Sequence, residues 1–287
     1  MTLSTSLGAL DALRWAADEL SGIVPSPMRE AEILVCHVLK CSRSDLYAAP
    51  NRRLDGETGV ELDRLVGGRR ELRPLQYLTG VQAFRELILA VGPGVLVPRP
   101  ETEMVVQRAL ELLEEIPDPW VVDVGTGSGA IALSIGIECP DSRLWATEIS
   151  KDALRWARLN SSRYRAARVE FTLGDLFMPL PDTMRGRFDL VISNPPYLTD
   201  SEFCSLPADV RDHEPKNSLV SGENGTEVST RLVKESIPWL REGGWLVLET
   251  SPDRWAHLQP VMMSYLRDVT IEPDLAGRLR IALGRKP

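Results

Sequence analysis

An apolar strand, a glycine-rich turn and a helix follow one another directly between residues 120 and 136. Trp120 to Val124 is almost wholly apolar, Gly125-Thr-Gly-Ser-Gly129 follows at once, and Ala130 to Gly136 has an apolar helical pattern. Glycines at such a turn let the backbone approach a ligand and present its N–H groups, and the helix dipole favours negative charge there. The order of strand, turn and helix indicates a βαβ unit.

Apolar runs alternate with helix-like segments through the rest of the chain after residue 100. This alternation predicts the α/β class, with a doubly wound, Rossmann-like sheet. Two further strands are expected around a loop near the C-terminus, which makes seven. The runs with strand character are 120–124, 143–149, 168–173, 188–193, 245–250, 268–273 and 279–284.

The first 75 or so residues have a helical pattern instead. Apolar residues recur every three or four positions from Leu7 to Leu20 and from Ala31 to Leu39, and a third such run ends near Gly67-Gly68. We expect a small N-terminal helical bundle. Such a bundle either helps to hold a substrate or serves only to stabilise the chain.

Between the bundle and the sheet, the pattern changes to two short apolar runs around a turn. Leu87 to Leu89 and Val95 to Val97 stand on either side of Gly92-Pro93-Gly94, which predicts a connecting β-hairpin. The expected domains are therefore a helical domain at 1–80, a connector at 81–100 and a Rossmann-like domain at 101–287.

Composition narrows the function classes. No apolar run approaches the roughly 18 to 20 residues that a membrane helix needs, and no signal peptide is evident, so a cytoplasmic monomer is expected. The net charge of -8 argues against a stable nucleic-acid partner, because such proteins usually carry a basic surface. The four cysteines form no CxxC pair, so neither a metal site nor a disulfide framework is expected.

Acidic residues end the second and third strands of the predicted sheet. Glu148 lies 148 − 125 = 23 residues after Gly125, near the offset at which a carboxylate binds ribose hydroxyls. Asp175 is placed to accept from an adenine amino group, with Leu176 covering the ring. Alternatively, Glu148 caps the next helix and Asp175 only forms a turn. A nucleoside ligand is expected here, and NAD, FAD and S-adenosylmethionine all remain candidates.

The fourth strand of the sheet runs directly into Asn194-Pro-Pro-Tyr197. Two prolines make the turn rigid and leave carbonyl acceptors exposed, and Asn194 adds a side-chain carbonyl. Tyr197 offers a flat ring. This cluster suits a planar NH2-bearing group, whose poorly nucleophilic nitrogen would be held against an electrophile by positioning alone. A purely structural proline turn is the alternative.

These motifs resemble a class I S-adenosylmethionine-dependent methyltransferase, and more narrowly the bacterial peptide chain release factor glutamine methyltransferases (the HemK/PrmC family). The resemblance extends over nearly the whole chain, and Pro98-Arg-Pro-Glu-Thr-Glu103 is its most family-specific part. Three positions depart from the family pattern: Glu148, where the family usually has Asp, Thr250, where it more often has glycine, and Leu279, where an acidic residue is common. The matching segments are 73–80, 95–103, 122–132, 194–197 and 209–215.

The resemblance implies N5-methylation of the glutamine in the Gly-Gly-Gln motif of release factors, with S-adenosyl-L-methionine converted to S-adenosyl-L-homocysteine. Together with the strand-end analysis, it assigns cofactor binding to Gly125, Thr126, Gly127, Ser128, Gly129, Glu148, Asp175, Leu176 and Asn194. It assigns catalysis to Asn194, Pro195 and Tyr197, with Pro196 also binding the glutamine. Pro98, Arg99, Glu101 and Thr102 would lie over the site as a lid, or Arg99 and Glu101 would form a salt-bridged scaffold.

Three alternatives share parts of this pattern. A ribosomal-protein glutamine methyltransferase would have the same cofactor loop and tetrapeptide. A nucleic-acid amino-N-methyltransferase would present the same site to adenine or cytosine, but it would have to flip the base and grip phosphates, which the acidic balance disfavours. A non-catalytic cofactor-binding module would not need Asn194 and Tyr197.

Overall fold

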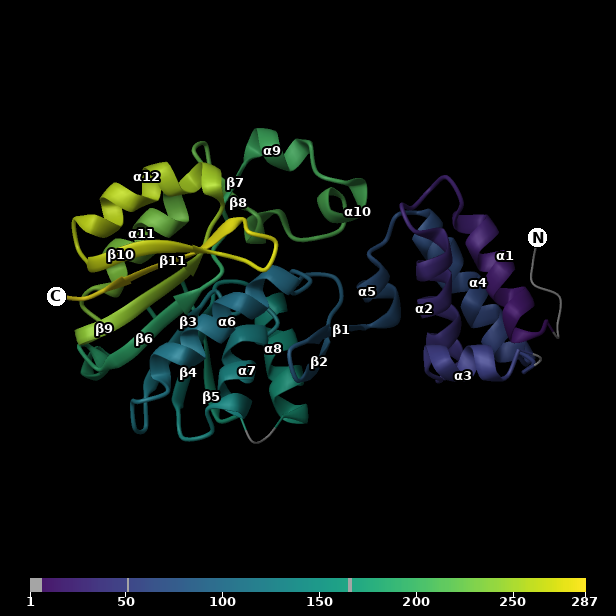
Figure 1. Cartoon of the computed structure of the whole chain (residues 1–287), viewed down its shortest axis with the longest axis horizontal. Helices are drawn as coiled ribbons and strands as arrows, with labels where there is room; N and C mark the ends of the chain where they lie inside the picture. The colour runs from purple at the N-terminus through teal and green to yellow at the C-terminus, as the bar shows by residue number, and fades with distance from the viewer. Residues whose placement is uncertain (1–6, 51, 165–166) are drawn as a thin grey trace. The chain divides into compact units, whose positions relative to one another are not determined.

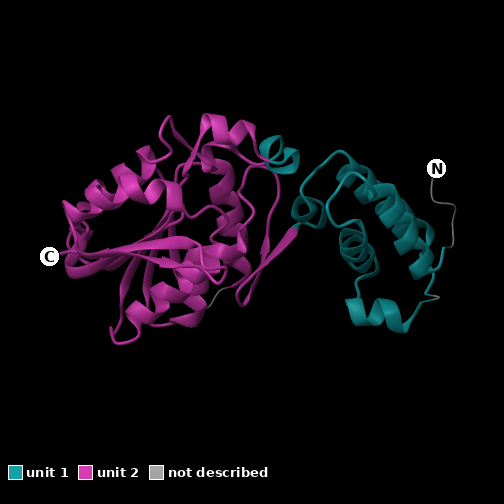
Figure 2. Cartoon of the chain, turned by 45° about the horizontal axis from the view of Figure 1, so that its top comes forward, with its two compact units in different colours: residues 1–80, 207–213 teal, residues 81–206, 214–287 magenta. Residues whose placement is uncertain are grey.

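The computed structural model describes residues 7–50, 52–164 and 167–287. The chain divides into two compact units, and the first consists of residues 1–80 together with 207–213 (Figure 2). The second comprises residues 81–206 and 214–287. The segment 207–213 therefore packs with the first unit, although the chain on both sides of it belongs to the second.

The first unit is a helical bundle around one apolar core. Its long helices begin at recognisable start signals: Pro27 stands at the first turn of α2, and the Asp55 carboxylate accepts from the N–H of Thr58 at the start of α4. The apolar stripes expected from the sequence face inward, and Ala16, Leu20 and Leu34 are fully buried. The helices are α1 (Ala9–Leu20), α2 (Pro27–Leu39), α3 (Arg43–Ala48), α4 (Gly56–Arg70), α5 (Leu75–Thr79) and α10 (Ala208–Arg211).

The second unit contains the predicted seven-stranded sheet, which is confirmed within the described residues. Its strand order is β10-β11-β9-β6-β3-β4-β5. The five strands from β9 to β5 pair in parallel, whereas β11 runs antiparallel to both of its neighbours. The strands are β3 (Trp120–Val124), β4 (Arg143–Glu148), β5 (Val169–Leu173), β6 (Phe188–Ser193), β9 (Leu240–Glu249), β10 (Arg267–Pro273) and β11 (Leu279–Arg285).

Helices cover both faces of the sheet, as Figure 1 shows. Side chains alternate along each strand, so Val121 joins one apolar core while Val122 joins the other. On the Val121 side lie α6 (Pro100–Leu113), α7 (Ala130–Glu138) and α8 (Lys151–Arg163). On the Val122 side lie α11 (Glu227–Ser236) and α12 (Pro252–Met263). No helix among the described residues is long and apolar enough to span a membrane.

The connecting hairpin exists, but its strands are not the predicted pair. The run at 87–89 is confirmed as β2 (Leu87–Ala90), yet its partner is β1 (Val81–Phe84), and the prediction of a strand at 95–97 is wrong. Arg85, with φ at +48°, makes the turn instead of Gly92-Pro93-Gly94. Pro93 and Pro98 lack N–H donors, which disfavours a sheet ladder through residues 93–98.

After β6 the chain forms several short elements outside the seven-stranded sheet. It begins with β7 (Leu198–Thr199), which pairs in parallel with β8 (Val220–Gly222). Between these strands lie α9 (Asp200–Cys204), the segment 207–213 and a 3-10 turn at Lys216–Ser218. A second 3-10 turn, Asp182–Met184, lies between β5 and β6.

Candidate active site

A cavity of about 350 Å³ opens at the carboxyl ends of the parallel strands. This is where open α/β sheets bind their ligands, because the loops after neighbouring strands meet there. The cavity is lined by residues from the ends of four strands, β3, β4, β5 and β6. Gly125, Glu148, Asp175 and Asn194, which the sequence places at those four ends, are thus brought together.

The turn after β3, residues 125–129, is called the glycine loop below. Gly125 and Gly127 have φ at +74° and +59°, a left-handed conformation that favours glycine, and nothing lies within 4 Å of where their Cβ atoms would stand. The N–H groups of Gly125 and Thr126 both donate to the Thr147 carbonyl at the end of β4, at 2.9 and 3.0 Å. Backbone hydrogen bonds to the end of β4 therefore hold the start of the loop beside the cavity.

Asp123 secures this loop from beneath, a role the sequence analysis did not assign. Its carboxylate is fully buried and accepts from Thr126 Oγ1 at 2.5 Å and from the Ala132 N–H at 3.2 Å. Burial raises the pKa of Asp123 to about 7. The sequence does hold a signal for this role, since Asp123 is a lone carboxylate inside an apolar strand, directly before the glycines. A charged side chain is buried in such a strand only where hydrogen bonds compensate for the loss of water.

Glu148 connects the second strand to the glycine loop. Its Oε2 accepts from the Gly127 N–H and its Oε1 from the Ser150 N–H, each at 2.8 Å. Burial raises the pKa of this carboxyl. Ser150 itself caps α8 by accepting from the Ala153 N–H, so Glu148 is not the helix cap. Each carboxylate oxygen keeps acceptor capacity, so Glu148 can also accept two hydroxyls.

The third strand end carries Asp175 and Leu176. Both line the cavity, and Asp175 forms an ion pair with Arg231 of α11 at 2.9 Å. Any contact from Asp175 to an adenine amino group would share the carboxylate with this arginine. Leu176 has φ at +46°, an uncommon conformation for a residue with a side chain, which holds its apolar side chain at the cavity wall.

The tetrapeptide at 194–197, called the NPPY turn below, follows β6. Asn194 donates from Nδ2 to Thr102 Oγ1 at 3.0 Å. Among the described residues, neither Asn194 Oδ1 nor the Pro195 carbonyl oxygen accepts a hydrogen bond. Asn194, Pro195 and Pro196 all line the cavity. The turn therefore offers two acceptors for a group that carries two N–H donors.

Tyr197 places its hydroxyl beside a buried carboxylate. Its hydroxyl donates to Glu249 Oε1 at 3.5 Å, its carbonyl oxygen accepts from Arg254 Nε at 2.9 Å, and it is not among the residues that line the cavity. Burial, followed by the nearby Glu249, raises the pKa of Tyr197 to about 12. The hydroxyl therefore stays protonated, and the proposed ring stacking remains a prediction.

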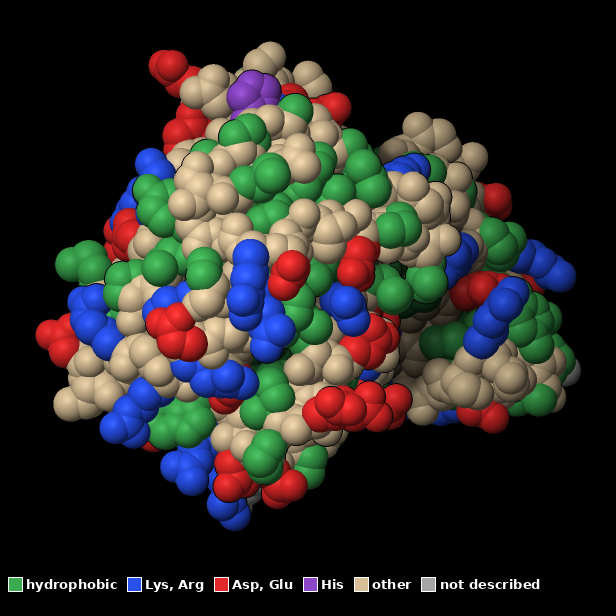
Figure 3. Space-filling view, turned by 60° about the vertical axis from the view of Figure 1, so that its left-hand side comes forward, with side chains coloured by type: hydrophobic (Ala, Val, Ile, Leu, Met, Phe, Trp, Pro, Cys, Tyr) green, Lys and Arg blue, Asp and Glu red, His purple; other side chains and the backbone are tan. Residues whose placement is uncertain are grey.

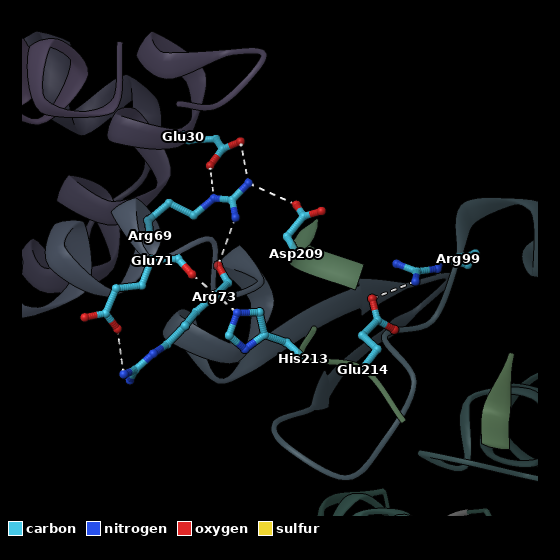
Figure 4. Close-up of polar contacts among 8 residues, drawn as sticks. All are labelled: Glu30, Arg69, Glu71, Arg73, Arg99, Asp209, His213 and Glu214. Atoms are coloured by element: carbon cyan, nitrogen blue, oxygen red, sulfur yellow. Dashed lines mark hydrogen bonds and ion pairs between the residues drawn. The ribbon is translucent and has the colours of Figure 1, made fainter. Parts of the chain in front are cut away.

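The four expected lid residues separate into different environments. Pro98 and Thr102 line the cavity. Arg99 donates to Glu214 at 2.6 Å (Figure 4). The other oxygen of that buried carboxylate accepts from the Val97 N–H at 3.1 Å. This contact favours the scaffold interpretation of Arg99. The role of Glu101 stays a prediction.

Comparisons with known proteins agree with this geometry. A family model described as "PrmC N-terminal domain" matches residues 11–80, and one described as "Methyltransferase small domain" matches residues 103–206. A release factor glutamine methyltransferase from Streptomyces coelicolor is 40% identical over 92% of each chain. One from Koribacter versatilis is 36% identical, again over 92% of each chain.

The solved structures that resemble this one share the fold at low sequence identity. The T. thermophilus 16S rRNA N2 G1207 methyltransferase, solved with AdoMet and guanosine, superposes with a TM-score of 0.54 at 16% identity. The match covers 72% of this chain and 50% of the other. The architecture around the cavity is thus that of a Rossmann-like methyltransferase.

Proposed function

Because the chain belongs to the family of release factor glutamine methyltransferases, we propose that it methylates the glutamine of the Gly-Gly-Gln motif in peptide chain release factors. The methyl group of S-adenosylmethionine replaces one hydrogen of the side-chain amide. The other products are S-adenosylhomocysteine and a proton. The observation that carries the proposal is the pair of acceptors, Asn194 Oδ1 and the Pro195 carbonyl oxygen, at the wall of the cavity that the glycine loop also lines.

The residues at the cavity fit S-adenosylmethionine. The open, left-handed glycines leave room for a ligand against the backbone, and Glu148 is a buried carboxylate with acceptor capacity for ribose hydroxyls. Leu176 offers an apolar surface for the base. When bound, this cofactor supplies an electrophilic methyl group on a sulfonium sulfur.

An amide nitrogen is a poor nucleophile because its lone pair is delocalised into the carbonyl. Asn194 Oδ1 and the Pro195 carbonyl oxygen would accept the two amide hydrogens, which fixes the nitrogen in place. Acceptors in this arrangement favour the pyramidal nitrogen of the transition state over the planar ground state, so they lower the barrier selectively. Holding the nitrogen in line with the methyl group removes much of the entropic barrier.

The identity of the substrate rests on the relatives and on charge. The relatives are release factor enzymes, which favours a release factor over a ribosomal protein. The chain has a net charge of -8, and on the face of the described residues drawn in Figure 3 positive and negative side chains are mixed, without a continuous basic stripe. We therefore propose that nucleic acid is not the acceptor and that the helical first unit helps to hold the protein substrate.

Transfer of labelled methyl from S-adenosylmethionine to a purified release factor tests the proposal. The factor is compared with its Gly-Gly-Gln glutamine-to-alanine variant and with unmodified DNA and RNA. We expect label on the wild-type factor alone; label on nucleic acid, or on none of the four samples, would overturn the proposal.

The Asn194→Ala variant tests the two-acceptor mechanism in the same assay. Loss of one preorganised partner is expected to lower kcat by about 100-fold or more with an unchanged circular dichroism spectrum. Asn224→Ala, at an exposed asparagine of the second unit, is the matched control and should keep full turnover. Substantial turnover in Asn194→Ala would contradict the mechanism.

A further inference from the structure

Behind Asn194, on the side away from its free acceptor, lies a buried chain of polar side chains. Thr102, in the first turn of α6, accepts from Asn194 Nδ2 at 3.0 Å and donates to Glu249 Oε2 at 2.6 Å. Glu249 is the last residue of β9. Thr102 and Glu249 are 4% and 1% exposed, so the hydrogen bond between these two side chains is shielded from water.

Glu249 determines which groups donate and which accept in this series of hydrogen bonds. When Glu249 is ionised, its carboxylate can only accept, so the single hydroxyl hydrogen of Thr102 is then committed to Glu249. The Thr102 oxygen can then only accept from Asn194, which requires the NH2 side of the asparagine amide to face Thr102. The carbonyl side, Oδ1, is thereby directed to the opposite side, as a free acceptor.

We propose that Thr102 and Glu249 are positioning residues that hold the Asn194 side-chain amide in the one orientation that can accept an N–H from the substrate. This inference rests on the proposed function. Without the two residues, the amide of Asn194 could turn over and present its NH2 to the NH2 of the glutamine, a contact between two donors that is repulsive.

Titratable and charged groups from the NPPY turn, β11 and α6 act on Glu249. Tyr197 from the NPPY turn donates to its other oxygen at 3.5 Å, and Arg280 of β11 and Glu101 of α6 act on its charge with opposite signs. Arg280 Nε is buried, lies 3.7 Å from Asp274, and has no hydrogen-bond partner in the described part of the chain. Burial raises the pKa of Glu249 to about 7, and the bond from Thr102 and the charge of Arg280 oppose that rise.

Burial of a carboxylate is unfavourable, and an apolar side chain of similar size would fill the same space with less penalty. Thr102 likewise does not cap α6, because the capping position belongs to Arg99. Neither side chain is therefore explained by helix or sheet stability alone. A hydrogen-bonded chain that ends on Asn194 explains both.

Three variants of the full chain test the proposal: Thr102→Val, Thr102→Ser and the exposed-threonine control Thr270→Val. Each is assayed for kcat and KM with a purified release factor, and for the dissociation constant of S-adenosylmethionine by calorimetry. Thr102→Val keeps the shape and removes the hydroxyl, and we expect kcat to fall about tenfold, with KM and the dissociation constant within about twofold of wild type. Thr102→Ser keeps the hydroxyl and should recover most of the kcat that Thr102→Val loses, and Thr270→Val should retain wild-type kcat.

Glu249→Gln removes the charge that determines the polarity, and it relieves the penalty of burying a carboxylate, so it is expected to fold. Its kcat should fall severalfold, and the part of the rise of wild-type kcat with pH near 7 that ionisation of Glu249 causes should be lost in the variant. If Thr102→Val does not fold, Glu249→Gln tests the positioning role instead.

Wild-type kcat in Thr102→Val, or a loss in Thr102→Ser equal to that in Thr102→Val, would overturn the inference. So would an unchanged kcat and pH profile in Glu249→Gln. Failure of the wild-type chain to methylate any release factor would instead overturn the proposed function, so the two failures are distinguishable.

Discussion

Replacement of Asn160 by alanine should destabilise the second unit strongly. Asn160, in α8, is fully buried. Its Oδ1 accepts from the Ala90 N–H at 2.6 Å, and its Nδ2 donates to the carbonyl oxygens of Ala90 and Ser128, both at 3.0 Å. One side chain therefore bonds the end of the hairpin to the glycine loop.

The magnitude follows from these three bonds. Each contributes a net stabilisation of about 1 kcal/mol, and a buried group left without a partner costs about 1 to 3 kcal/mol. Because Asn160→Ala strands three buried backbone groups, the free energy of unfolding should fall by about 3 kcal/mol or more. With a urea slope of about 2 kcal/mol/M, the midpoint of unfolding should fall by about 1.5 M.

Urea unfolding followed by tryptophan fluorescence measures this change. Of the seven tryptophans, only Trp15 lies in the first unit, so the signal reports mainly on the second. Ser162→Ala, on the same helix, removes an exposed bond to the Leu159 carbonyl and should leave the midpoint nearly unchanged. A loss below about 1 kcal/mol in Asn160→Ala would refute the reasoning that these three bonds are essential.

Two further variants address the cavity and the segment 207–213. Glu148→Ala should raise the dissociation constant of S-adenosylmethionine at least tenfold in a calorimetric titration, because hydrogen bonds to a charged acceptor contribute about 1.5 to 3 kcal/mol each. The exposed control Glu223→Ala should leave this constant unchanged. An unchanged constant in Glu148→Ala would mean that the carboxylate only holds the glycine loop. Asp209→Asn removes one of the two carboxylates bound to the buried guanidinium of Arg69, at 3.1 Å, and should speed proteolytic cleavage at 207–213 severalfold. Equal cleavage rates in Asp209→Asn and in the exposed control Asp212→Asn would contradict that anchoring role.

Much of the second unit was predictable because its signals are local. An apolar run of five or six residues that ends at a turn signal, such as Gly125 or Asn194-Pro195, favours a strand, and 120–124 and 188–193 are strands with the predicted bounds. Since the carboxyl ends of parallel strands meet at one edge, the residues after them were also expected to converge. Gly125, Glu148 and Asn194 do converge, because all three line the same cavity.

Strand pairing was less predictable, because it depends on which partner can complete a ladder. The run at 95–97 has the apolar character of a strand, yet β2 pairs with β1. Local pattern does not reveal that a tight turn at Arg85-Glu86 competes with the glycine-proline turn at 92–94. The register is decided only when the alternatives compete in three dimensions.

Contacts between distant residues were decided by the tertiary structure alone. Thr102 and Glu249 are 147 positions apart, and Arg69 and Asp209 are 140 apart. The sequence analysis named Thr102 only as a lid residue and gave no role to Glu249, Asp123 or Asn160. Their partners lie on other elements, so no spacing along the chain marks them. A short motif reveals chemistry that one turn of backbone can carry, whereas the bonds that orient such a motif depend on side chains that only folding brings within 3 Å.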